Sequence, residues 1–158
     1  MSEFFDKIYP DWKEKQLEKY AKIFPLLEPY LYGLESVLDL GIGKAWFEEF
    51  ISIKGYKFPR VLGVDISEEA VLPKVSGIEY VLQKNFSTEE KFDFVVCIDA
   101  LHLLENKNIL EYCKPGGIAL IALPANRKNL LESFSREEVL IQAQAGQQEL
   151  DEFVLLRK

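Results

Sequence analysis

The sequence predicts an α/β fold in which a doubly wound, mainly parallel sheet carries helices on both faces and ends in an antiparallel strand. Two observations support this class. Short, mostly apolar runs at 37–40, 60–66 and 92–98 have the length and composition of strands buried on both sides. Turn and helix signals separate these runs, and strands that alternate with helices form mainly parallel sheets.

The first of these strands leads into a glycine-rich turn, Asp39-Leu40-Gly41-Ile42-Gly43. Gly41 and Gly43 lack a Cβ atom, so the backbone can turn sharply there and come close to a ligand. Such a strand–turn–helix junction lies at the carboxyl edge of an open α/β sheet, where ligands bind. The turn is therefore a candidate nucleotide site.

Spacing separates three kinds of glycine loop. A phosphate-binding P-loop requires Gly, four residues and then Gly-Lys-Ser/Thr, but Leu38 and Ala45 occupy the first and last of these positions. A dinucleotide fingerprint requires a glycine where this chain has Trp46, which argues against a nicotinamide-dependent oxidoreductase. The remaining pattern is an acidic residue followed by glycines at alternate positions.

That pattern resembles motif I of the class I S-adenosylmethionine-dependent methyltransferases of the type 11-like group. Asp39, Gly41 and Gly43 match it, and Ala45 stands where the family usually has its last glycine. The family has a Rossmann-like fold. The resemblance implies the same fold here, with S-adenosyl-L-methionine as the cofactor.

Later segments resemble the family in the same order along residues 34–146. Asp65 ends a second apolar strand 26 residues after Asp39, at about the distance where a carboxylate can take both ribose hydroxyls as donors. Residues 92–104 resemble the fourth strand and its outgoing loop, and residues 114–124 resemble the Lys-Pro-Gly-Gly turn and fifth strand. The resemblance implies the following cofactor contacts: Asp39, Gly41, Ile42, Gly43, Asp65, Ile66, Asn85, Asp99 and Leu101.

Catalytic residues are harder to identify, because methyl transfer from a sulfonium depends mainly on alignment in a site closed to water. A general base is needed only where the acceptor must lose a proton. His102 is the only histidine and follows the fourth strand, so it is the candidate base. The alternative is that His102 only packs or caps the turn after that strand.

We expect a single domain with an amino-terminal helical segment (1–33), a cofactor-binding core (34–124) and a shortened carboxyl-terminal part (125–158). Asp11 and Glu14 form a capping-box pattern for the first helix.

Pro25 and Pro29 are expected to break the first helical segment before the first strand. A second helix is predicted over 45–54, and a stunted one after Ser67. A third strand is predicted over 78–82, with the usual helix between it and the fourth strand missing. A further helix is predicted from Asn106 to Tyr112.

The carboxyl-terminal part allows two readings. Ser135 and Glu138 form a capping-box pattern, flanked by Phe134 and Val139 as a hydrophobic staple, so a helix to about Ala145 is favoured. The alternative is a strand over 139–145 that forms a hairpin with the last strand, which lies within 149–157. Either reading gives an abbreviated version of the fold.

Composition restricts the partners. With 158 residues and 48% hydrophobic content the chain suits one domain, and a net charge of −7 argues against nucleic acid as a partner. No apolar run approaches 18 residues, which predicts no membrane span. Two cysteines and one distant histidine form no metal motif, and the cysteines suit reduced thiols of a cytoplasmic protein.

The leading hypothesis is a methyltransferase that acts on a small molecule or a protein side chain. The alternative is a non-catalytic S-adenosylmethionine-binding or interaction subunit, because few segments remain to build a substrate site. A homo-oligomer or a complex with a partner subunit is compatible with either hypothesis.

Overall fold

The computed structural model describes residues 12–134, 138–147 and 150–158. Their centre is a seven-stranded sheet with the strand order β3-β2-β1-β4-β5-β7-β6. Strands β1 to β5 pair in parallel, whereas β7 pairs antiparallel with both β5 and β6. The strands are β1 (Ser36–Leu40), β2 (Arg60–Asp65), β3 (Ile78–Leu82), β4 (Phe92–Ile98), β5 (Cys113–Pro124), β6 (Glu138–Ala145) and β7 (Asp151–Arg157).

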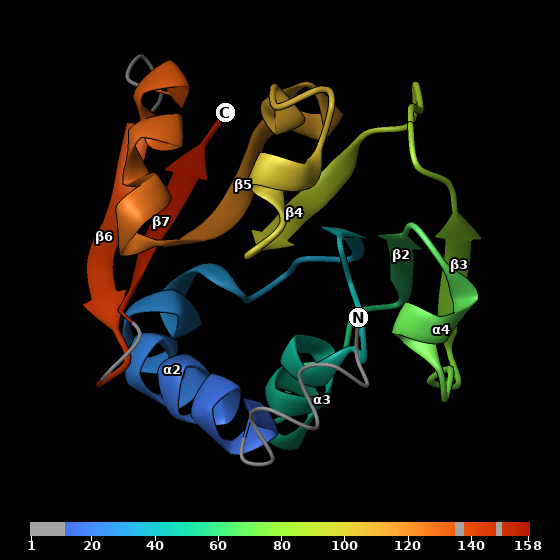
Figure 1. Ribbon diagram of the computed structural model, residues 1–158, viewed down its shortest axis with the longest axis horizontal. Helices are drawn as coiled ribbons and strands as arrows, with labels where there is room; N and C mark the ends of the chain where they lie inside the picture. The colour runs from blue at the N-terminus through green and yellow to red at the C-terminus, as the bar shows by residue number, and fades with distance from the viewer. Residues whose placement is uncertain (1–11, 135–137, 148–149) are drawn as a thin grey trace.

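The described helices cover both faces of the sheet (Figure 1). One face carries the α-helices α2 (Trp12–Leu27), α3 (Trp46–Ile53) and α4 (Glu68–Val71), together with the 3₁₀ helix η1 (Glu28–Tyr30) that follows α2. The other face carries the 3₁₀ helices η2 (Leu101–Leu103), η3 (Ile109–Tyr112) and η4 (Ala125–Phe134). The expected cover on both faces is confirmed, but the second layer consists of tighter and less regular 3₁₀ segments.

Both faces of the central strands are apolar, so each strand contributes to two cores. In β4, Phe94 and Val96 pack toward α2 and α3, and Val95 and Cys97 pack toward the opposite face. All four side chains are fully buried. This is the pattern of a parallel strand covered on both sides.

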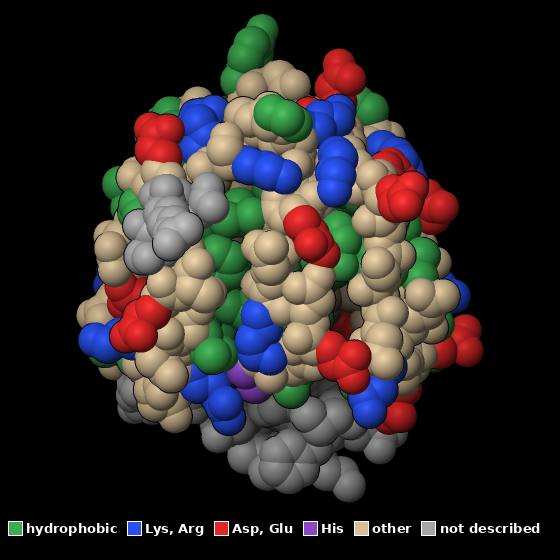
Figure 2. All heavy atoms as spheres, turned by 90° about the horizontal axis from the view of Figure 1, so that it is seen from above, with side chains coloured by type: hydrophobic (Ala, Val, Ile, Leu, Met, Phe, Trp, Pro, Cys, Tyr) green, Lys and Arg blue, Asp and Glu red, His purple; other side chains and the backbone are tan. Residues whose placement is uncertain are grey.

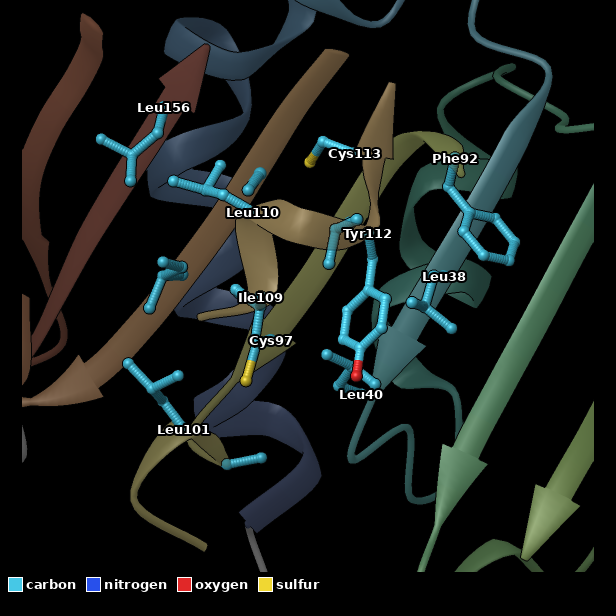
Figure 3. Packing of buried hydrophobic residues seen from close by; sticks show 14 of the residues in the cluster. Leu38, Leu40, Phe92, Cys97, Leu101, Ile109, Leu110, Tyr112, Cys113 and Leu156 are labelled. Atoms are coloured by element: carbon cyan, nitrogen blue, oxygen red, sulfur yellow. The ribbon is translucent and has the colours of Figure 1, made fainter. Parts of the chain in front are cut away.

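The 3₁₀ helix η3 contributes buried side chains to the core of the second face, although it has only four residues. Ile109, Leu110 and Tyr112 are buried and pack in one cluster with Leu38 and Leu40 of β1 (Figure 3). Burial of these side chains stabilises a segment that is too short to form a stable helix by itself.

The strand order determines where the candidate ligand site lies on the sheet. The chain moves outward from β1 to β3 and then returns to put β4 on the other side of β1. The carboxyl ends of β1, β2 and β4 therefore meet at the point where the order reverses. Ligands of open α/β sheets bind at such a switch point.

The predicted strands up to β5 and the predicted helix over 45–54 are confirmed, and α4 is as short as expected. Residues 83–91 contain no helix, as predicted. The expected cap at Asp11 lies outside the described residues.

The predicted break at Pro25 is wrong, because Pro25 lies inside α2, which continues to Leu27. The α-helix does end before Pro29, which lies in the following 3₁₀ helix η1 (Glu28–Tyr30). Burial of Ile23 and Leu27 outweighs the backbone hydrogen bond that Pro25 removes.

The predicted helix from Asn106 to Tyr112 is also shorter than expected, because η3 begins only at Ile109. Asn106 Oδ1 accepts a hydrogen bond from the backbone N–H of Asn108 at 3.0 Å. The asparagine therefore forms a turn with its own backbone, a local alternative to capping a helix.

The favoured helix up to Ala145 is wrong, and the hairpin reading is correct. β6 pairs antiparallel with β7 from Glu138 to Ala145. Ile141 and Ala145 are buried against the α2 side, whereas Val139, the expected staple residue, is 51% exposed. Pairing with β7 overrides the local helix signal. Ser135 of the expected capping box lies outside the described residues.

A buried ion pair joins the first described helix to β7. Lys19 Nζ lies 3.3 Å from Asp151 Oδ2, and the two side chains are 4% and 5% exposed. We expect Lys19→Met to lower the free energy of unfolding by about 3–5 kcal/mol, because it leaves a buried carboxylate without its cation. Urea unfolding measures this.

The matched control is Lys13→Met, because the pair of Lys13 and Glu49 is 47% exposed on both sides. An exposed pair contributes no more than about 1 kcal/mol. Equal losses in the two variants would contradict the importance of the buried pair.

Candidate functional site

The glycine turn is fixed by its neighbours on both sides. The backbone N–H groups of Gly41 and Ile42 donate to the carbonyl oxygen of Val64 at 2.8 and 3.0 Å. Gly41 has φ +81°, and a Cβ atom there would lie 2.5 Å from the Cβ of Ala100. The turn thus needs glycine both for its backbone angle and for the close approach of the segment after β4.

Asp65 connects the end of β2 to the glycine turn. Its Oδ2 accepts a hydrogen bond from the N–H of Gly43 at 2.8 Å, and its Oδ1 accepts one from the N–H of Ile66 at 2.7 Å. Each carboxylate oxygen can accept a second hydrogen bond. Asp65 is therefore oriented and still has capacity for two hydroxyl donors.

Lys44, within the glycine turn, extends to α4. Its Nζ donates to the backbone carbonyl oxygens of Glu69, within that short helix, and of Leu72, which directly follows it. A cation at the carboxyl end of a helix satisfies carbonyl groups that lack an intrahelical partner. Lys44 thus links the glycine turn to the next segment of the chain.

Two cavities open at the carboxyl edge, and both include Gly41 in their walls. The first measures about 270 Å³ and includes Asp65, Ile66 and Asn85 from the predicted set. Ile66 is 63% exposed, so its apolar side chain is available to a ligand. Sequence reasoning missed further wall residues, among them Phe86, Leu103 and Tyr112.

The second cavity, of about 220 Å³, lies on the other side of the glycine turn. Asp39, Ile42, Gly43 and Asp99 of the predicted set line it. Helix α2 closes part of it with Trp12, Gln16 and Tyr20.

A pair of carboxyl groups lies beneath the second cavity. Asp39 is 3% exposed, and its side chain is hydrogen-bonded to Glu48 in the first turn of α3. Burial raises the pKa of Asp39 well above its usual range, and the carboxyl groups of Glu48 and Asp65 add to the rise. Burial also raises the pKa of Glu48. Two buried carboxyl groups in contact cannot both ionise, so the pair holds a proton.

Glu48 was not predicted as a site residue. Its only sequence signal was an acid in the first turn of the helix that starts at the glycine turn. That position is common for helix stabilisation and so does not by itself indicate a site.

Asp99 occupies an unusual backbone conformation at the end of β4. Its φ is +57°, and its N–H donates to the carbonyl oxygen of Ala122 at 2.7 Å. Non-glycine residues with positive φ often occur at functional sites, where the surrounding structure holds them. The bend at Asp99 directs the following residues away from the line of the strand.

The bend places the next two candidates away from the cavity walls. Leu101 is fully buried in the core of the second face and lines neither cavity. His102 is partly buried and also lies outside both walls. Burial lowers the pKa of His102, and Arg127 and Lys107 lower it further. The imidazole is therefore neutral at neutral pH and can accept a proton.

Among the described residues, no group of three or more His, Cys, Asp and Glu side chains could hold a metal ion. No helix in the same part of the chain is long and apolar enough to cross a membrane.

An α/β sheet with a glycine turn at its switch point and an oriented acid on the next strand defines a nucleotide-type ligand site. Residues 12–148 match the methyltransferase domain family. The chain belongs to this family. A comparison with curated proteins finds no match.

Solved structures share the fold. The plantazolicin methyltransferase BpumL in complex with SAH is 15% identical, with a TM-score of 0.68 over 99% of this chain and 88% of that one. A SAM-dependent methyltransferase from Aquifex aeolicus is 16% identical, with a TM-score of 0.59 over 90% and 96% of the two chains. A Haloferax volcanii complex between the Trm112 methyltransferase activator and a methyltransferase gives 11% identity and a TM-score of 0.63, over 96% and 95%.

Two glycine variants test the packing of the turn. Gly41→Ala should destabilise the protein more than Gly43→Ala, because a Cβ at Gly41 meets Ala100 whereas one at Gly43 meets nothing within 4 Å. Both have positive φ and share a backbone cost of about 1–2 kcal/mol. Thermal unfolding should show an extra loss of at least about 1 kcal/mol for Gly41→Ala. Equal losses would mean that the segment at Ala100 moves freely.

A pH series tests the carboxyl pair. A raised pKa means that the folded state keeps a proton on Asp39 that the unfolded state releases above about pH 4. The free energy of unfolding of the native protein should therefore fall, relative to that of the Asp39→Asn variant, as pH rises from about 4 to 7. If the difference in unfolding free energy between the native protein and the variant did not change with pH, a protonated pair would be contradicted.

Asp93→Asn is the control, because the pKa of Asp93 is shifted in the opposite direction from that of Asp39. Burial acts to raise the pKa of Asp93, but hydrogen bonds from the N–H groups of Glu35 and Ser36 and the nearby Lys114 ammonium outweigh it and lower the pKa. The stability that Asp93 provides is present above its ordinary pKa and is lost as pH falls through its lowered value.

Proposed function

We propose that this protein is an S-adenosylmethionine-dependent methyltransferase whose acceptor is a small molecule or a protein side chain. The observation that carries the proposal is the pair of cavities that meet at Gly41, with Asp65 in the wall of one and Asp39 and Asp99 in the wall of the other. Together they reach the range of roughly 300–1,000 Å³ typical of small-molecule sites.

The residues present fit this cofactor in both cavities. On the first side, Asp65 would hold the ribose hydroxyls, and Ile66 and Asn85 would lie beside adenine. On the second side, the acidic wall of Asp39 and Asp99 suits an ammonium group. When bound, the cofactor supplies a methyl group already activated by its sulfonium.

This chain's own contribution is position and exclusion of water. Trp12 and Tyr20 of α2, and Trp46 of α3, place apolar rings around the second cavity. A closed, apolar surround keeps water from the reacting atoms and fixes the acceptor. His102 is the proposed base for an acceptor that must lose a proton, because it is neutral and follows β4 at the same edge.

The cytoplasm remains the proposed compartment. Cys97 and Cys113 are buried on neighbouring strands and form no disulfide. Buried thiols of this kind suit a reducing environment.

A thermal unfolding scan tests the cofactor. S-adenosylmethionine and S-adenosylhomocysteine at about a hundred times their dissociation constants should each add about 2.7 kcal/mol of stability, and NAD should add none. Asp65→Ala should weaken binding of both adenosyl compounds at least tenfold, about 1.4 kcal/mol. Glu79→Ala, an exposed acid on β3, is the control.

The proposal would be overturned if neither adenosyl compound changed the unfolding temperature of a sample that unfolds cooperatively. An unchanged dissociation constant in Asp65→Ala would remove the ribose role of Asp65 alone.

The second candidate function is a cofactor-binding subunit that is not catalytic by itself. The Haloferax volcanii neighbour, which was solved with the Trm112 activator, shows that a protein of this fold can work with a partner. Tight binding of S-adenosylmethionine without turnover across broad substrate pools would favour this candidate. Turnover by the isolated chain would dismiss it.

A further inference from the structure

Basic side chains gather where β4 and β5 end. His102 lies in η2, directly after β4, and Arg127 and Lys128 lie in η4, directly after β5. The two strands are parallel neighbours, and η2 contacts η4. In Figure 2 the purple histidine side chain has blue Lys and Arg side chains on either side. We call His102, Lys107, Arg127 and Lys128 the basic cluster.

The positive side chains of the basic cluster form no ion pair with the described residues. Lys107 Nζ donates only to the backbone carbonyl of Leu104, and Lys128 lines a separate cavity together with Glu132 and Glu152. Some basic residues elsewhere in the described chain are paired with acids, namely Lys13, Lys19, Arg60, Lys74, Lys114 and Arg157. Others, such as Lys44 and Lys91, donate to backbone carbonyl oxygens.

His102 supplies an unused hydrogen-bonding atom in the same place. Its Nδ1 is buried and makes no hydrogen bond with the described residues. Arg127 and Lys107 act on its charge, and no carboxylate is among the groups that do. In a protein with a net charge of −7, the basic cluster is a local concentration of positive charge.

We propose that the methyl acceptor carries an oxyanion, a carboxylate or a phosphate, which Arg127 and Lys107 bind beside His102. The inference rests on the proposed function and specifies the acceptor's chemistry. A guanidinium binds a carboxylate or phosphate through two parallel hydrogen bonds, and a lysine adds a point charge. The positive charge of the cluster attracts such an acceptor in an otherwise acidic protein.

The same arrangement assigns His102 the role of general base. The bound oxyanion holds the acceptor with its hydroxyl or amine toward the imidazole. His102 would take the proton of that group while the acceptor's lone pair forms the bond to the methyl carbon. The bound cofactor would supply that methyl group, its carbon–sulfur bond breaking with the electron pair left on sulfur.

The single histidine of the chain makes the test direct, because its ring protons give one set of NMR signals. The protein is titrated with inorganic phosphate and, separately, with acetate, at constant ionic strength maintained with chloride. We expect the His102 signals to move along a saturating curve for at least one oxyanion and to stay in place with chloride. Which of the two saturates distinguishes a phosphate-bearing from a carboxylate-bearing acceptor.

Arg127→Ala and Lys107→Ala should each weaken the fitted affinity at least fivefold. Lys74→Ala, which removes a lysine paired with Glu68 at 3.7 Å, should leave it unchanged. A shift that grows linearly and equally with chloride, or an affinity that Arg127→Ala does not change, would overturn the proposal.

The titration is repeated with saturating S-adenosylhomocysteine. We expect the oxyanion to bind alongside it, and competition between the two would overturn the assignment to the acceptor. Failure here is separate from failure of the cofactor proposal, because the thermal scan with adenosyl compounds does not depend on the basic cluster.

Discussion

The carboxylate of Asp65 is the interaction on which the site depends. It joins the end of β2 to the glycine turn after β1 through the N–H of Gly43, while Val64 accepts two more hydrogen bonds from the same turn. The close approach of Ala100 to Gly41 adds the segment after β4. Three strand ends are thus held in one arrangement, and both cavities take their shape from it.

The parts of the site that could be predicted from sequence are those that chemistry fixes locally. Asp39, Gly41, Gly43 and Asp65 stand at the ends of short apolar strands, and the structure places all four around the glycine turn. Glu48 could not be predicted, because its contact with Asp39 depends on how α3 packs over β1. Non-local packing has no signature in a single sequence.

The segment after β4 shows a second limit. Its residues were identified as a group, but which of them face the cavity depends on the left-handed bend at Asp99 and the 3₁₀ geometry of η2. That geometry buries Leu101 and leaves Leu103 in the cavity wall. Likewise, pairing of β6 with β7 outweighed the helix signals before Ala145. A helix cap contributes about 1 kcal/mol of stability, and a strand that pairs along its whole length contributes more than that.

The ion pair between Lys19 and Asp151 also affects the order in which parts of the structure form during synthesis of the chain. Helix α2 supplies the aromatic wall of the second cavity, yet its buried lysine finds its carboxylate only at the start of β7. As a ribosome releases the chain from the amino end, α2 therefore emerges long before its anchor exists. The wall made by α2 already packs on α3, but it gains its ion pair only after the seventh strand has been added to the sheet, so a nascent chain that stops at β5 carries the glycine turn without this anchor.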